Sequence, residues 1–356
     1  MNSIYILQNT SYYDVLFNSI LNAKRSIYVS AFSYNLTENM DNLQLVRNIT
    51  KLLIQKSQEG IDVKLIFGNS YKTSKIQAFQ KLDMSNELAF TIFKSFGVQA
   101  SFFSHYKQES SHSKYVLIDD ELVFIGSHNF SPRAFGIGFD DSISILDERI
   151  GNQVKSIFLT DWKYSTLPPN SELVDFNNSN FIFPFFEKRD YEVPIIKDTI
   201  TSNVLLNHKY FEVLINEIEN SKASVFVSMF YFSYSKDTDS ITSKILNAIS
   251  KAFSKGVEVK IILDRDNPSD IYASSKANTK RYEELKKIGI NVKFDKPETA
   301  THSKLVIIDN RKIIIGSHNW TYGSFNYYQD LSLMIESKSL SDTFTDIYNK
   351  RFNSLD

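Results

Sequence analysis

Two stretches of the chain carry the same set of reactive side chains. Residues 111–130 read SHSKYVLIDDELVFIGSHNF and residues 301–320 read THSKLVIIDNRKIIIGSHNW, with eleven identical positions and no gap. Each stretch follows the pattern H-x-K-x4-D-x6-G-S-x-N. Histidine acts as nucleophile, acid or base near neutral pH, and lysine and asparagine donate hydrogen bonds that suit phosphate oxygens. The duplication therefore predicts phosphoryl-transfer chemistry in which one histidine attacks phosphorus and the other donates a proton.

Alternation along strands predicts which of these side chains converge. His112 and Lys114 lie two residues apart and face the same way on an extended strand, and Ser127 and Asn129 do so on the strand that returns after a turn. Gly126 leaves room for the close approach of backbone or ligand. The second stretch repeats all five residues as His302, Lys304, Gly316, Ser317 and Asn319. We expect the histidines, lysines and asparagines to be catalytic and the two serines to bind substrate.

Four acidic residues accompany the repeat at matching places. Asp119 and Asp309 stand an odd number of positions from their histidines, so they face the other side of the strand, and we expect them to brace the hairpin turn. Asp140 and Asp330 each follow the motif asparagine by eleven residues. A carboxylate there could orient a histidine ring, as the third member of a catalytic triad does. The alternative is an ordinary polar residue at the start of a strand.

A second pair of histidines lies inside the motifs. His128 and His318 stand between the serine and the asparagine and should point away from them, which predicts packed or hydrogen-bonded residues of a second layer. A zinc site built from histidine and aspartate is the rival interpretation. The lysine beside each key histidine opposes a bound cation, so we expect no metal and no cofactor.

The repetition extends beyond these stretches and predicts the fold. Residues 12–35 align with 210–233, and each segment begins with apolar residues at helical spacing and runs into a β-rich stretch. Each half continues with two helix–strand units, the motif hairpin and a closing apolar strand. Alternating strands and helices indicate an α/β protein, here two homologous α/β sandwich halves with mixed β-sheets, paired as an internal pseudo-two-fold dimer. We expect the halves at 1–165 and 201–356, with a linker or covering loop at 166–200.

Composition sets further bounds. Of the 356 residues, 42% are apolar and 23% charged, as in a soluble globular protein, and the net charge of −1 gives no global attraction to polyanions. The absence of cysteine excludes disulfides, cysteine-ligated zinc and thiol nucleophiles. The N-terminal sequence lacks a signal-peptide pattern and the apolar runs are too short to span a bilayer, so we expect a cytoplasmic location. The internal duplication removes the need for a catalytic dimer, and no obligate protein partner is evident.

At these motifs the chain resembles the phospholipase D superfamily, whose hallmark is a paired HKD motif. Both motifs match it in full, and the resemblance covers both halves. It implies a metal-independent phosphodiesterase in which His112 forms a covalent phosphohistidine and His302 acts as acid and then as base, although the symmetry of the repeat allows the reverse. It also implies that the lysines and asparagines hold the non-bridging oxygens. The family's downstream acid, often glutamate, corresponds to Asp140 and Asp330 and typically supports the histidine of the opposite half.

The residues after each motif suggest a substrate class. GSHNFS and GSHNWT look like the run found in the superfamily's nucleases, and the Asp and Arg-Ser pair usual in cardiolipin-synthase-like members is absent. We therefore expect a nuclease that cleaves DNA or RNA, single strands included, with Lys107, Arg133, Lys280 and Arg281 near its cleft. One alternative is a phospholipase D or phosphatidyl transferase acting on phospholipids, which the neutral charge and the aromatic segment NFIFPFF would suit. Another is a non-catalytic member that binds nucleic acid or membrane.

Overall fold

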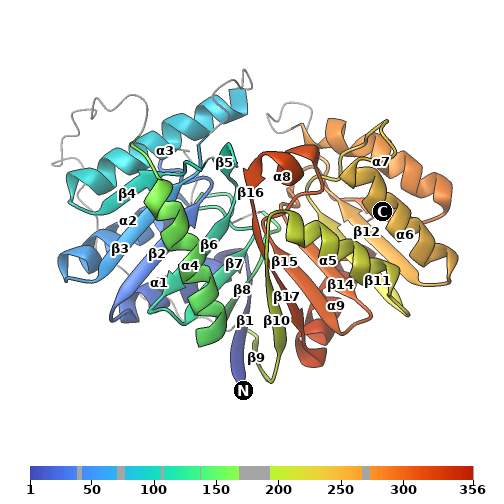
Figure 1. Ribbon diagram of the computed structural model, residues 1–356, viewed down its shortest axis with the longest axis horizontal. Coiled ribbons are helices and arrows are strands. Elements are labelled where there is room, and N and C mark those ends of the chain that lie inside the picture. Colours follow the sequence, from blue (N-terminus) through green and yellow to red (C-terminus); the bar gives the residue numbers. More distant parts are fainter. Residues whose placement is uncertain are drawn as a thin grey trace.

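The chain forms two similar α/β halves that lie side by side. The structure, a computed structural model, describes residues 1–37, 42–69, 77–105, 108–136, 138–167, 193–266 and 273–355. Figure 1 shows the first half in blue to green and the second in yellow to red. Each half contains one mixed β-sheet, because parallel pairs such as β2–β3 and antiparallel pairs such as β2–β6 occur in the same sheet. The predicted fold class is confirmed.

The two sheets correspond strand by strand. The first has the order β4-β3-β2-β6-β7-β8-β1-β9 and the second the order β10-β17-β15-β14-β11-β12-β13. The strands of the first are β1 (Asn2–Gln8), β2 (Ser26–Ala31), β3 (Asp62–Phe67), β4 (Gln99–Phe102), β6 (Lys114–Ile118), β7 (Leu122–Gly126), β8 (Asp141–Leu146) and β9 (Ile195–Asp198). Those of the second are β10 (Thr201–Leu206), β11 (Ser224–Met229), β12 (Glu258–Leu263), β13 (Asn291–Phe294), β14 (Lys304–Ile308), β15 (Lys312–Gly316) and β17 (Leu331–Glu336).

Helices cover both faces of each sheet. They are α1 (Thr10–Asn22), α2 (Leu43–Gln58), α3 (Gln77–Ser95) and α4 (Glu148–Tyr164) in the first half, and α5 (His208–Glu219), α6 (Ile241–Ser254), α7 (Ser274–Ile288), α8 (Tyr322–Asn326) and α9 (Lys338–Asn353) in the second. Residues of α1 to α3 form an outer core with the first sheet, and residues of α5 to α7 form the equivalent core on the second. Gly60 and Gly256 follow α2 and α6 with a φ of 89°, as expected for glycine after a helix C-terminus.

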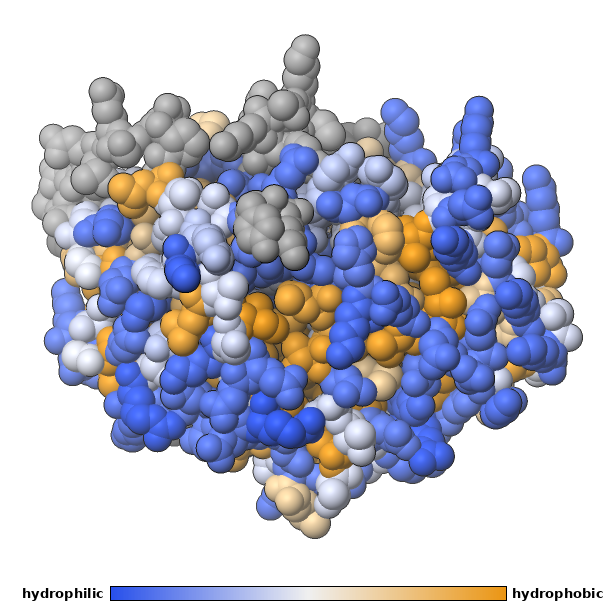
Figure 2. All heavy atoms as spheres, viewed as in Figure 1, coloured by the Kyte–Doolittle hydropathy of each residue, from blue (hydrophilic) through white to orange (hydrophobic). Residues whose placement is uncertain are grey.

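A third core joins the two halves. It combines the inner faces of both sheets with the apolar side chains of α4 and α9, so the sheets pack against each other with one helix from each half beside them. Figure 2 shows apolar side chains gathered in the middle of one face, between α4 and α5, with hydrophilic residues toward its edges. Partly buried members of this core include Ile157, Trp162, Val204 and Leu206. Hydrophobic burial across this seam therefore fixes how the halves sit relative to each other.

Several elements were not anticipated from the sequence. Strands β1 and β10 precede the first predicted helix of each half, and α4 and α9 follow the last predicted strand. Of the predicted linker at 166–200, residues 168–192, including NFIFPFF, lie outside the described residues, and β9 pairs antiparallel with β1. Among the described helices, none combines the length and apolar character needed to cross a bilayer.

Candidate active site

The two motif hairpins place their reactive residues at one end of the seam. His112 lies just before β6, which starts at Lys114, and β7 returns to Gly126. The second motif repeats this arrangement with β14 and β15. All of these strands are almost fully buried, as their valine and isoleucine content favours. The motif side chains of both halves therefore start from rigid central strands.

Short backbone contacts tie each motif histidine to the opposite half. Strand β5 (Ser110–Ser111) pairs in parallel with β16 (Tyr328–Gln329), and Figure 1 shows both near α8 at the top of the seam. The N–H of His112 donates to the carbonyl of Gln329 at 2.8 Å. The second half repeats this contact, since the N–H of His302 donates to the carbonyl of Phe139 at 2.9 Å.

Each histidine side chain is paired with an aspartate of the other half. His112 Nδ1 lies 2.8 Å from Asp330 Oδ1, and His302 Nδ1 lies 2.8 Å from Asp140 Oδ1. An ionised carboxylate at Nδ1 selects the tautomer that carries its proton there, which leaves Nε2 with a free lone pair. Aspartate reaches the histidine although its side chain is one methylene shorter than that of glutamate. The crossed pairs bring both histidines into a single site between the halves.

The two motif serines support the carboxylates. Ser127 Oγ donates to Asp140 Oδ1 at 2.7 Å, and Ser317 Oγ donates to Asp330 Oδ1 at 2.6 Å. Each hydroxyl also accepts the N–H of a residue at the start of the closing strand, at 3.1 and 3.0 Å. Both serines are fully buried. These bonds engage both hydroxyls in orienting the aspartates, and their role in substrate binding stays a prediction.

The motif lysines lie beside the histidines. Lys114 Nζ donates to the carbonyl of His112 at 2.7 Å, and Lys304 Nζ donates to the carbonyl of His302 at 2.5 Å. Burial lowers the pKa of Lys304 to about 7. Burial, and after it the charge of Lys304, lowers the pKa of Lys114 well below its ordinary value. Burial and mutual repulsion disfavour the charged forms of these lysines, so an anion such as a phosphodiester bound beside them would stabilise those charged forms.

Burial also controls the protonation of the histidines. It lowers the pKa of His112 to about 4 and that of His302 to about 3, and the adjacent lysine of the same motif adds to both shifts. Burial alone would raise the pKa of the partner aspartates, but the charge and hydrogen bond of the paired histidine hold both Asp140 and Asp330 below their ordinary values. Without substrate, both histidines are therefore neutral at pH 7 and both aspartates ionised.

Two phenylalanines form a side of the site that sequence reasoning missed. Phe32 lies edge-on to the His112 ring, with centroids 4.5 Å apart, and Phe230 lies in the same way 4.9 Å from the His302 ring. The ammonium groups of the motif lysines lie 4.7 and 5.0 Å from these two phenylalanine rings. Both phenylalanines occupy the same position in the aligned segments 12–35 and 210–233. This shared position was the signal in the sequence that could have identified them as residues of the site.

Two strained asparagines were also missed. Asn9 and Asn207 precede α1 and α5 with the same backbone angles, φ 50° and ψ −126°, which residues other than glycine rarely adopt. Asn207 Oδ1 accepts the backbone N–H of Asp330 at 3.0 Å, next to the crossed pair. Each asparagine stands three residues before a tyrosine, Tyr12 or Tyr210, of the repeat. Their recurrence before that tyrosine was the only sequence signal.

The remaining histidines of the motifs lie in a second layer. His128 Nδ1 lies 2.7 Å from a serine hydroxyl of β8, and His318 Nδ1 lies 2.8 Å from the equivalent serine of β17. Their rings stack on Tyr12 and Tyr210 at centroid distances of 4.3 and 4.1 Å. Burial lowers the pKa of both histidines. These histidines therefore pack behind the site as neutral rings.

The motif asparagines lie at the ends of the returning strands. Asn319 is buried and Asn129 half-buried. In both, the buried Oδ1 atom has no hydrogen-bond partner within the described part of the chain. They are thus the polar motif side chains that the internal network leaves least engaged.

The motif aspartates and glycines serve the hairpins. Asp119 accepts backbone N–H groups of Lys24 and Arg25 at 2.9 and 2.6 Å, and Asp309 accepts the equivalent groups before β11 at 2.9 and 2.7 Å. A side chain on Gly126 or Gly316 would collide with the backbone of the closing strand next to it. The two aspartates lie at the turn end of each hairpin, away from the crossed pairs, and the two glycines lie directly before the serines that bond Asp140 and Asp330.

Comparison with known sequences identifies this arrangement. The sequence matches the protein family described as "Cardiolipin synthase, PLD-like domain" over residues 16–162 and 214–355. The chain belongs to this PLD-like family. The matched segments cover most of both halves and include both motif hairpins. The resemblance to the phospholipase D superfamily is thereby confirmed.

Relatives of this PLD-like chain carry names from lipid metabolism. A cardiolipin synthase of Alkalihalophilus pseudofirmus is 26% identical over 79% of this chain and 53% of its own length, and cardiolipin synthase A of Buchnera aphidicola is 22% identical over 98% and 69%. The chain therefore spans little more than half the length of the first of these relatives. The crystal structure of phosphatidylserine synthase from Haemophilus influenzae superposes with a TM-score of 0.71 at 12% identity, covering 99% of this chain and 89% of that one, which shows a shared fold.

These relatives do not support the predicted nuclease, and the structure explains why the signal misled. The aromatic residues after each motif, Phe130 and Trp320, are buried in the two outer cores. The next residues, Ser131 and Thr321, accept a backbone N–H three residues further on, at 3.2 and 3.1 Å, and so cap short turns. Their identity reports local folding and says nothing about the substrate.

The basic residues assigned to a nucleic-acid cleft need correction as well. Arg281 is almost fully buried, pairs with Glu284 at 2.8 Å and lies over the Phe232 ring at 4.5 Å, so it belongs to the packing of α7. Lys280 is exposed and lies over a tyrosine ring at 5.2 Å. Lys107 lies outside the described residues. Arg133 is half-buried. Of the three residues that the structure describes, Arg281 is therefore removed from the predicted cleft by its burial.

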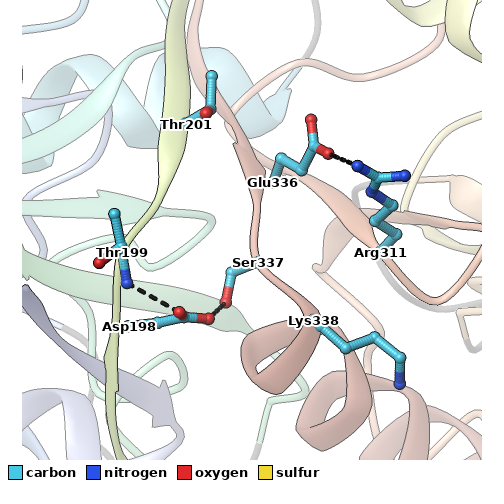
Figure 3. A pocket seen from close by; sticks show the side chains of 7 residues that line it. All are labelled: Asp198, Thr199, Thr201, Arg311, Glu336, Ser337 and Lys338. Atoms are coloured by element: carbon cyan, nitrogen blue, oxygen red, sulfur yellow. Dashed lines mark hydrogen bonds and ion pairs between the residues drawn. The ribbon is translucent and has the colours of Figure 1, made fainter.

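Two other features of the described residues lie apart from this chemistry. Among them, no three histidine, aspartate or glutamate side chains gather closely enough to hold a metal ion. A polar pocket lies between β9, β10 and the start of α9 (Figure 3). Its groups bond to one another, with Arg311 2.6 Å from Glu336 and Asp198 2.5 Å from Ser337. Because Glu336 ends β17 while Asp330 precedes it, this pocket lies at the opposite end of the sheet from the crossed pairs.

Proposed function

We propose that this chain cleaves or transfers the phosphodiester of a phospholipid through a covalent phosphohistidine. The observation that carries this proposal is the crossed pairing of His112 with Asp330 and of His302 with Asp140 beside two buried lysines. Two histidines with free Nε2 atoms in one site suit a double displacement at phosphorus. The names of the relatives support a phospholipid as the substrate.

In the first step, His112 Nε2 attacks phosphorus and an N–P bond forms as the bond to the leaving alcohol breaks. His302, protonated once the anionic substrate is bound, gives its proton to the leaving oxygen. Lys114 and Lys304 stabilise the charge on the non-bridging oxygens, and Asn129 and Asn319 donate to the same oxygens. Asp330 keeps the His112 ring oriented while positive charge develops on it.

In the second step, His302 takes a proton from water or from an acceptor alcohol, whose oxygen attacks phosphorus as the N–P bond breaks. Water gives net hydrolysis, and a phospholipid alcohol gives transfer. The His302 side chain is 18% exposed and that of His112 only 8%. This difference supports His302 as the group that meets the departing and incoming alcohols, and His112 as the enclosed nucleophile.

The test is an assay with two substrate classes in the presence of EDTA. We expect phosphatidylglycerol vesicles to yield phosphatidic acid, or cardiolipin with release of glycerol, and we expect His112→Ala and His302→Ala to abolish both products. Labelled single- and double-stranded nucleic acids serve as the second arm. Cleavage of nucleic acid without any lipid product would overturn the substrate class, and a strict requirement for added divalent metal would overturn the mechanism.

A further inference from the structure

Each motif histidine is held at two points by two consecutive residues of the opposite half, an aspartate and the residue before it. Gln329 accepts the backbone N–H of His112, and the next residue, Asp330, binds its ring. Phe139 and Asp140 do the same for His302. The position of each histidine therefore depends on a dipeptide from the opposite half, and whatever fixes that dipeptide also fixes the histidine.

Asp161, a buried acid of the first half, holds the dipeptide Gln329–Asp330. The Gln329 side chain reaches into the first half, where its Nε2 donates to Asp161 Oδ2 of α4 at 2.5 Å. Asp161 and Gln329 are each 3% exposed. Burial raises the pKa of Asp161 to about 7, and burial followed by the charge of Asp161 raises the pKa of Tyr115 on β6. Burying a carboxyl group costs free energy, so packing alone does not account for Asp161, and its hydrogen bond to Gln329 suggests a role in holding that residue.

Arg351 of the second half holds the equivalent dipeptide, Phe139–Asp140. Arg351 occupies in α9 the position that Asp161 occupies in α4. Its guanidinium lies 3.9 Å from the centre of the Phe139 ring, donates to Thr301 Oγ1 and lies 3.2 Å from Asp295 Oδ2. Thr301 directly precedes His302. Equivalent positions of α4 and α9 thus contact equivalent residues of the opposite half. Asp161 does so by a hydrogen bond to the Gln329 amide and Arg351 by a cation–π contact with Phe139.

From this geometry we infer that Asp161 and Arg351 are positioning residues, which set the placement of His112 and His302 through Gln329 and Phe139. The inference rests on the proposed phosphohistidine reaction. An error of about 1 Å in the placement of a reacting group costs on the order of 10²-fold in rate. The last helix of each half would thereby control the histidine of that same half by way of the other half's strand.

Kinetics of two Asp161 variants test this. We expect Asp161→Ala to lower kcat at least about tenfold while KM changes less than about twofold, because the substrate contacts themselves remain. Asp161→Asn should keep at least about half of kcat, since its carboxamide oxygen accepts the same bond. Gln329→Ala and the double variant should match Asp161→Ala, since both residues act in one chain. Equal kcat for Asp161→Ala and the wild type, or an equal loss in Asp161→Asn, would overturn the inference.

A second measurement needs no substrate, so it stays readable if the substrate class is wrong. In spectra of the protein labelled with ¹⁵N-histidine, Asp161→Ala should move the ring signals of His112 and leave those of His302 in place. Arg351→Met should do the reverse, and Arg351→Lys, which keeps a cation over Phe139, should move them less. Unmoved histidine signals in folded Asp161→Ala and Arg351→Met would reject a positioning role whatever the enzyme acts on.

Discussion

The two halves agree where chemistry is needed and differ where only support is needed. Both present a histidine, a lysine, a serine and an aspartate in the same bonds. Behind these residues the halves diverge, with Gln329 against Asp161 on one side and Phe139 against Arg351 on the other. A reacting group tolerates little change in type, whereas a backbone can be held in place by quite different contacts.

The surroundings of the two histidines differ as well. The Tyr328 ring lies 5.8 Å from that of His112, whereas the equivalent position beside His302 is Gly138, which has no side chain. Duplicated reacting groups therefore sit in unequal surroundings. Such inequality suits a two-step reaction in which one histidine stays attached to phosphorus while the other exchanges protons with alcohols.

Removing the histidines gives the largest expected effect and tests which half does what. His112→Ala and His302→Ala should each lower turnover of phosphatidylglycerol at least about 10³-fold. With phosphatidyl-p-nitrophenol, whose leaving group needs no proton, His302→Ala should still release a burst of about one nitrophenol per enzyme. His112→Ala should release none, because it lacks the nucleophile. A burst in His112→Ala alone would exchange the roles of the halves.

Changing the aspartates tests the crossing itself. Asp330→Asn should behave like His112→Ala and give no burst, and Asp140→Asn should behave like His302→Ala and keep the burst. Each should lower steady-state turnover by about 10²- to 10⁴-fold, because an amide favours the wrong histidine tautomer. The opposite assignment, with each aspartate matching the histidine of its own half, would contradict the crossed pairs.

The supporting residues of the two halves should differ in how they make the stability of the chain depend on pH. Burial raises the pKa of Asp161 to about 7, so between pH 4 and 7 the folded chain keeps a proton that the unfolded chain has lost. This group therefore lowers the free energy of unfolding as pH rises through that window, by up to about 1.4 kcal/mol per pH unit. Urea unfolding should show Asp161→Asn gaining stability relative to the wild type between pH 5 and 7.

Arg351→Gln is the matched control for this measurement in the other half. It leaves Asp161 and its bond to Gln329 in place, so its stability should fall between pH 5 and 7 with the same slope as that of the wild type. Parallel curves for Asp161→Asn and the wild type would show that Asp161 is ionised in the folded chain across this range.

The motif serines give the smallest effect, and it should be equal in the two halves. Ser127→Ala and Ser317→Ala each remove one hydrogen bond to a carboxylate, a loss of about 1.5 kcal/mol or tenfold in kcat/KM. Ser131→Ala, which removes only a turn cap, should stay within about twofold. A tenfold rise in KM with unchanged kcat in either motif variant would return that serine to substrate binding.

The strands of the site could be predicted from the sequence, but the pairing of each histidine with a particular aspartate could not. The spacing of His112 and Lys114 predicts a shared face, and β6 and β14 carry them as expected from their alternating neighbours. Geometry within one repeat cannot tell whether Asp330 meets the histidine of its own half or the other, since that depends on how the halves dock. The family resemblance carried that information, and the central core between the sheets provides its physical basis.

Other residues were missed for different physical reasons. Phe32 and Phe230 read as ordinary strand-end aromatics, and their contact with a histidine arises only when β2 and β11 lie beside the motif hairpins. Phe130 and Trp320 misled because aromatic residues next to a motif can serve the core as readily as a ligand. Helix α4 did leave a pattern, with Ile150, Val154 and Phe158 buried four residues apart.

The crossed pairs also set when this protein can first act. His112 is synthesised early, but the carboxylate that orients its ring follows 218 residues later. A chain still emerging from the ribosome, with only its first half folded, holds no complete dyad. The ability to attack phosphorus therefore arises late in synthesis, once the second half has folded against the first.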